Sequence, residues 1–130
     1  MRMMRGIAAL LCVWPAIVAA SPYDGTYRQA TDSDCAKIGE PGGALKIADG
    51  VFTGVGMSCQ MTRPVNVVDM DATLYQMECG GGDGAWSARA MVMNTHEGDG
   101  IFMVWDGYVF RYARCPDPEP SGDAAPAAGD

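Results

Sequence analysis

Apolar and polar residues alternate with a period of two through most of the chain between Ser21 and Cys115. Successive residues of a β-strand point to opposite faces, so this pattern predicts strands with one buried face. We find no stretch with helical periodicity in the same region. The expected strands are residues 24–28, 44–48, 51–57, 65–68, 72–79, 86–93, 101–105 and 108–114.

Turn residues separate these segments. Asp49-Gly50 and Asp106-Gly107 are dipeptides of the kind that form two-residue hairpin turns, because both central positions of such a turn need a positive φ. Residues 29–43 are rich in Asp, Ser, Gly and Pro, and we expect a loop there.

The alternation also assigns side chains to faces. In each of three segments, alternate residues are expected to share one face. The three sets are Val51, Thr53, Val55, Met57 and Cys59; Tyr75, Met77 and Cys79; and Tyr108, Phe110 and Tyr112. Seven to eight short antiparallel strands with regular turns are typical of an all-β fold, either a small barrel or a sandwich. A closed barrel would remove the exposed strand edges that promote aggregation.

The first twenty residues have the features of a secretory signal peptide. Arg2 and Arg5 precede an apolar stretch from Ile7 to Val18, and small residues follow at positions 19 and 20. Cleavage is expected after Ala20. The apolar stretch is shorter than the roughly 20 residues that span a bilayer, so we expect no membrane span in the mature protein. An uncleaved anchor is the alternative.

Four cysteines follow the predicted signal, at positions 35, 59, 79 and 115. An even number of cysteines in a short exported chain favours disulfides, and the wide spacings lack the close pairs of a zinc site. Three pairings are possible. We expect Cys35 to join Cys115, because this bridge would connect the first and last strands of a closing barrel, and Cys59 to join Cys79. Each bridge would contribute about 3 to 4 kcal/mol.

Composition divides the chain into three parts. Residues 1–20 are the predicted signal peptide, residues 21–115 the all-β domain, and residues 116–130 an acidic Pro- and Ala-rich tail that is expected to be disordered. The chain has nine basic and sixteen acidic residues; two of the basic residues lie in the signal, so the net charge of the remainder is −9. Nucleic acid is therefore an improbable partner.

The candidate chemistry is sparse. Met91, Met93 and His96 could bind a soft metal such as copper, but methionine also fills irregular cores, and we interpret these methionines as core residues. A weak calcium site at paired aspartates is a further alternative. A single histidine and no free thiol in the domain leave no catalytic arrangement, so the sequence predicts neither an enzyme nor a cofactor.

Aromatic residues are concentrated late in the chain. Trp105, Tyr108 and Tyr112 alternate with Arg111, and Trp, Tyr and Arg are the residues enriched at interface hot spots. We therefore predict a partner surface at these four residues, with burial in the core of the last hairpin as the alternative. The expected function is a periplasmic or secreted, non-catalytic binding or inhibitor-like module whose partner is a protein of the cell envelope. A small-ligand or soft-metal carrier and a structural envelope accessory are the alternatives.

Several segments carry a resemblance. The signal, the Asp24-Gly25-Thr26-Tyr27 start, the stretch Cys59 to Met70, and the closing Asp106 to Cys115 resemble uncharacterised small exported four-cysteine β-proteins of Gram-negative bacteria. The architecture is remotely similar to the periplasmic inhibitors of c-type lysozyme, which are small disulfide-containing β-barrels. Their inhibitory Ser-Gly-x-x-Tyr loop does not occur here, so this likeness implies only a fold.

Overall fold

The computed structural model describes residues 12–15 and 20–116. These residues contain nine strands and no helix: β1 Gly25–Arg28, β2 Asp34–Ile38, β3 Gly43–Ala48, β4 Val51–Gly54, β5 Met57–Asn66, β6 Ala72–Gly81, β7 Trp86–Asn94, β8 Gly100–Trp105 and β9 Tyr108–Arg114. The predicted signal segment lies mostly outside the described residues, and the predicted tail lies outside them from residue 117. Within the described residues, no helix is long and apolar enough to cross a membrane.

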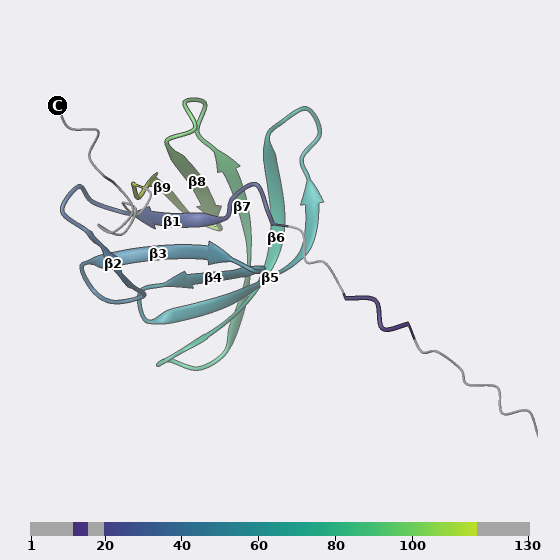
Figure 1. The fold of residues 1–130 in the computed structure, drawn as a ribbon, viewed down its shortest axis with the longest axis horizontal. Helices are drawn as coiled ribbons and strands as arrows, with labels where there is room; N and C mark the ends of the chain where they lie inside the picture. The colour runs from purple at the N-terminus through teal and green to yellow at the C-terminus, as the bar shows by residue number, and fades with distance from the viewer. Residues whose placement is uncertain (1–11, 16–19, 117–130) are drawn as a thin grey trace, which may run out of the picture.

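Eight of the strands form a closed antiparallel barrel. Each strand from β3 to β9 pairs with its neighbour in the sequence, and β1 pairs with both β9 and β3. Figure 1 shows β1 lying between these two ends of the sheet. The all-β fold is thereby confirmed as a barrel, in which every one of the eight wall strands has a partner on both sides.

The ninth strand, β2, lies outside this ring. It pairs in parallel with the start of β3, in an irregular register in which Asp34 is opposite Gly43 and Ile38 opposite Ala44. The close approach requires glycine at position 43, because a Cβ there would collide with the carbonyl oxygen of Lys37. Residues 29–43 are therefore not loop throughout, as the sequence predicted. The strand was missed because it has no alternating apolar face.

Both predicted disulfides are present. Cys35 of β2 is joined to Cys115, which directly follows β9. Cys59 and Cys79 are directly opposite each other on β5 and β6. The first bridge attaches β2 to the place where the barrel closes, and the second crosslinks neighbouring strands of its wall.

The region of β4 and β5 differs from the prediction. The expected strand 51–57 is interrupted by a turn at Val55-Gly56, where Gly56 has a φ of 68°, and the expected strand 65–68 is replaced by a long β5. A bulge between Thr62 and Val65 lets β5 continue past Pro64. The turn also changes the faces. Phe52 lies opposite Cys59 and is 2% exposed, so the inward face of β4 carries Phe52 rather than Val51 and Thr53.

One end of the barrel, next to residues 21–24, is filled by side chains. The hydroxyl groups of Tyr23 and Thr73 are 2.9 Å apart, and the Tyr27 hydroxyl donates a hydrogen bond to the carbonyl oxygen of Tyr23. The guanidinium of Arg114 lies 5.1 Å from the centre of the Tyr27 ring. Because both tyrosines are buried, residues 21–24 close this end of the barrel, which we call the closed end.

Candidate functional site

The opposite end of the barrel, which we call the mouth, contains a cavity of about 470 Å³. Directly opposite residues in antiparallel strands share a face, so rows of side chains run around the inner wall. One row joins Phe52, Cys59, Cys79 and Trp86, and another joins Tyr75, Ala90, Trp105 and Tyr108. The mouth is thus lined by large rings that come from several different strands.

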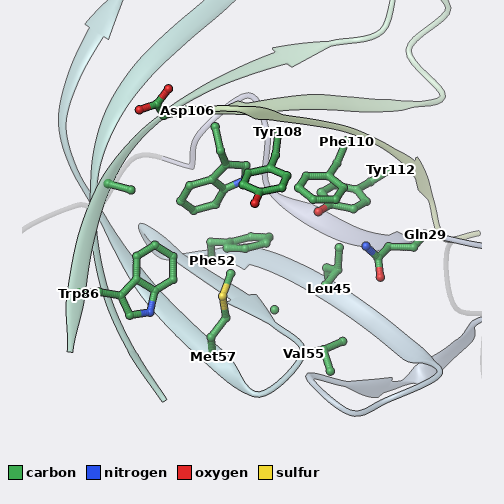
Figure 2. Close-up of a pocket in the computed structure, with 13 residues that line it drawn as sticks. Gln29, Leu45, Phe52, Val55, Met57, Trp86, Asp106, Tyr108, Phe110 and Tyr112 are labelled. Carbon is green, nitrogen blue, oxygen red and sulfur yellow. The ribbon is translucent and has the colours of Figure 1, made fainter. Parts of the chain in front are cut away.

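The lining is mostly apolar and aromatic. Thirteen residues line the cavity: Gln29, Leu45, Phe52, Gly54, Val55, Met57, Trp86, Ala88, Trp105, Asp106, Tyr108, Phe110 and Tyr112. Figure 2 shows Phe52 and Leu45 on one side of the cavity, facing the rings of Tyr108, Phe110 and Tyr112 on the other. A concave site of this size and composition is typical of small-ligand pockets, which usually span about 300 to 1,000 Å³.

Three of the rings extend in a row along β9 from solvent into the barrel. Tyr108 is 67% exposed at the rim, Phe110 is partly buried, and Tyr112 is 5% exposed. Their planes are nearly parallel, with angles of 11° between the first two and 6° between the last two. The row results from the alternation of β9, and it forms one continuous aromatic wall of the cavity.

Two tryptophans form the adjoining wall. The ring centres of Trp86 and Trp105 are 5.9 Å apart and their planes are inclined by 48°. Trp105 also lies 6.3 Å from the ring of Phe52. Trp86 is 41% exposed, so this pair forms an open aromatic corner beside the mouth.

The cavity has few polar groups. Burial raises the pKa of Tyr112 to about 12, and hydrogen bonding with Gln29, an exposed residue that follows β1, opposes the shift. The phenol is therefore neutral at physiological pH and can donate a hydrogen bond. Asp106 lies at the rim, in the turn between β8 and β9, with its carboxylate directed away from the rings in Figure 2.

Alkaline pH should destabilise the protein in part through Tyr112. A phenol with a pKa of about 12 in the folded chain and about 10 in the unfolded chain makes the free energy of unfolding constant below pH 10. That free energy then falls as the pH rises from 10 towards 12, because the unfolded state loses its proton first. Urea unfolding between pH 8 and 11.5 measures the decline.

The variant Tyr112→Phe should show a shallower decline over the same pH range. Some dependence should remain, because burial also raises the pKa of Tyr23, Tyr27 and Tyr75. An identical pH profile in the wild type and in Tyr112→Phe would contradict the assignment.

Three of the four residues of the predicted partner surface meet at the cavity. Trp105, Tyr108 and Tyr112 all line it, whereas Arg111 points to the outside of the barrel. Arg111 forms an ion pair with Asp99, 3.1 Å from its carboxylate. The Thr95 hydroxyl donates a hydrogen bond to the same carboxylate at 2.7 Å. This hydrogen bond and the charge of Arg111 both lower the pKa of Asp99. The structure therefore does not bring Arg111 together with the aromatic residues.

The side of the cavity that β3, β4 and the start of β5 provide was not predicted from the sequence. Leu45, Phe52 and Met57 belong to strands far from β9 in the sequence, and Gln29 lies in the predicted loop. A correct assignment of the turn at Val55-Gly56 would have placed Phe52 inward. The pairing of distant strands, however, is not visible in the local pattern.

The candidate soft-metal residues lie elsewhere. Met91 and Met93 are partly buried on the outer face of β7, opposite Val104 and Phe102 of β8, and His96 is exposed in the turn after β7. The interpretation of these two methionines as core residues was wrong, because the inward positions of β7 are Ala90 and Val92. Among the described residues, no group of three or more His, Cys, Asp or Glu side chains could hold a metal ion.

Comparisons with protein families, curated proteins and solved structures found no match to this chain.

Proposed function

We propose that this protein is an exported, non-catalytic binding protein that holds a small apolar ligand in the mouth of its barrel. The observation that carries the proposal is the cavity of about 470 Å³, lined by six aromatic side chains and open to solvent between Trp86 and Tyr108. Burying apolar ligand surface against such a lining contributes about 25 cal/mol per Å².

The shape of the site supports a ligand that enters rather than one that lies on a surface. The rings line a concave wall that continues from the rim to the buried Tyr112, and the phenol of Tyr112 and the amide of Gln29 supply polar groups beside it. A few polar groups in an apolar pocket are how such sites orient a ligand.

The two disulfides support an oxidising compartment for this protein, since cytosolic thiols are kept reduced. Together with the predicted signal peptide, they favour the periplasm or the cell exterior as its location. A carrier in that location would shield an apolar compound from water between membranes or partner proteins.

A protein partner is the second candidate function. Tyr108 and Val109 are both 67% exposed at the start of β9, next to the mouth, so the rim could contact an envelope protein as an inhibitor-like module does. Such a partner would insert a side chain into the same cavity, and it would therefore compete with a small ligand.

A neutral fluorescent probe tests the proposal. N-phenyl-1-naphthylamine should bind one-to-one and saturably, with a blue-shifted emission and a change in the fluorescence of Trp86 and Trp105. These are the two tryptophans after residue 20, and both line the cavity. Absence of saturable binding would refute the proposal.

Matched variants locate the probe. Ala88 points into the cavity and Ser87, its neighbour on β7, is exposed outside. Ala88→Phe should fill the cavity and weaken probe binding at least about tenfold, equivalent to about 1.4 kcal/mol. Ser87→Phe adds the same ring on the outer face and should leave the affinity unchanged. Equal losses in both variants would mean that the probe binds elsewhere.

A further inference from the structure

The charge of the cavity restricts the ligand. Of the thirteen lining residues, Asp106 is the one acidic residue, and none is Lys, Arg or His. An anionic headgroup placed against this lining would lose its hydration without gaining a cation, which is strongly unfavourable. A neutral or cationic ligand meets no such cost.

The connections around the mouth add to this restriction. They are residues 29–33, 39–42, 55–56, 82–85 and 106–107, and they contain the four acidic residues Asp32, Glu40, Asp83 and Asp106 but no basic residue. Their position at the mouth follows from the cavity lining, which includes Gln29, Val55 and Asp106, and from the hydrogen bond that Gly56 N–H donates to the carbonyl of Gly39. Carboxylates that surround an apolar opening attract cations and repel anions.

The aromatic corner supplies direct contacts for a cation. The inclined rings of Trp86 and Trp105, with centres 5.9 Å apart, and the exposed ring of Tyr108 lie where the cavity opens. The face of an indole or phenol ring attracts an ammonium group, and aromatic sites of this kind recognise quaternary ammonium ligands. The apolar lining deeper in the cavity, around Phe52 and Leu45, suits a hydrocarbon body.

We propose that the ligand is a cationic amphiphile, an alkyl or aryl body with a quaternary or protonated amine. Its body occupies the barrel, and its cation lies at the aromatic corner of Trp86 and Trp105, beside the ring of Tyr108. This inference depends on the proposed function, because it specifies the ligand class of the same cavity. It separates the protein from carriers of fatty acids and other anionic lipids, whose headgroups need a basic partner.

Three eight-carbon compounds test the charge preference. Octyltrimethylammonium, 1-octanol and octanoate share a chain length and differ in headgroup charge. Titrations followed by tryptophan fluorescence at low ionic strength should show octyltrimethylammonium binding at least about tenfold more tightly than octanoate, with 1-octanol between them. Added salt should reduce the ratio of the two charged ligands, since it screens the field of the carboxylates.

Two substitutions that each remove one negative charge provide the control. Asp106→Asn at the mouth should lower the ratio of octyltrimethylammonium to octanoate affinity about two- to threefold. Asp69 lies in the turn before β6, at the closed end, and asparagine accommodates its positive φ of 59°. The variant Asp69→Asn should therefore leave the ratio unchanged.

The outcomes separate the two proposals. Equal affinity for all three compounds, or tighter binding of octanoate, would overturn the cationic class while leaving a general apolar carrier intact. If N-phenyl-1-naphthylamine binds and none of the three compounds does, the ligand class is also wrong. If neither the probe nor any of the three binds saturably, the proposed function fails together with the inference.

Discussion

Replacing Cys35 and Cys115 together by alanine should lower the free energy of unfolding by about 4.5 kcal/mol, the loop-entropy value for their separation of 80 residues. The bridge restricts the unfolded chain across nearly the whole domain. It also holds β2 beside a barrel seam where β1 and β9 pair at only two positions. Urea unfolding of the purified variant, followed by circular dichroism, measures the loss.

The second bridge provides the comparison. The Cys59→Ala, Cys79→Ala variant opens a loop with a separation of 20 residues, for which the same relation gives about 3.3 kcal/mol. We therefore expect the Cys35/Cys115 variant to be the less stable of the two. The reverse order would mean that the constraint on the unfolded chain is not the main contribution of these bridges.

Phe52→Ala should lower the free energy of unfolding by about 3 to 5 kcal/mol, as expected for deletion of a buried aromatic ring. Phe52 is 2% exposed, lies opposite Cys59, and contacts the ring of Trp105. Its removal would leave a void that extends the mouth cavity into the core. Urea unfolding measures this change, and the emission of Trp105 reports the loss of its neighbour.

The matched substitution at the rim is Tyr108→Ala. Tyr108 is 67% exposed, so its removal should change the free energy of unfolding by about 0.5 kcal/mol or less. It should nevertheless weaken binding of N-phenyl-1-naphthylamine, since its ring lines the cavity. A collapse of stability in Tyr108→Ala, or unchanged probe binding, would remove Tyr108 from the site.

The local sequence pattern predicted the structure correctly where a feature depends on one strand or one turn alone. Asp49-Gly50 forms the predicted hairpin between β3 and β4, with φ values of 53° and 74°. Tyr75, Met77 and Cys79 share the buried face of β6, as the alternation predicted. In such cases the conformational preference of the turn residues and the period of two contain the needed information.

Errors occurred where that information was absent or was altered by a neighbouring segment. The turn at Val55-Gly56 has no Asn or Asp before its glycine, so the alternation was extended through it, and Val51 and Thr53 were assigned to the face of Cys59 that Phe52 occupies. Met91 and Met93 are hydrophobic enough for a core position, yet they face outward, because the inward positions of β7 are occupied by Ala90 and Val92. Hydrophobicity alone does not determine which of two faces is inside when both carry apolar residues.

The sequence by itself determined the class of the fold, the four paired cysteines, and the row of Tyr108, Phe110 and Tyr112 along one strand. These properties depend on neighbours in the chain or on the number of cysteines. Only the tertiary structure decided that the sheet closes through β1, β3 and β9, and that Phe52, Trp86 and Trp105 face the same row across a cavity. The reason is physical: a cavity is the volume left between strands distant in the sequence, and its size depends on barrel closure and register.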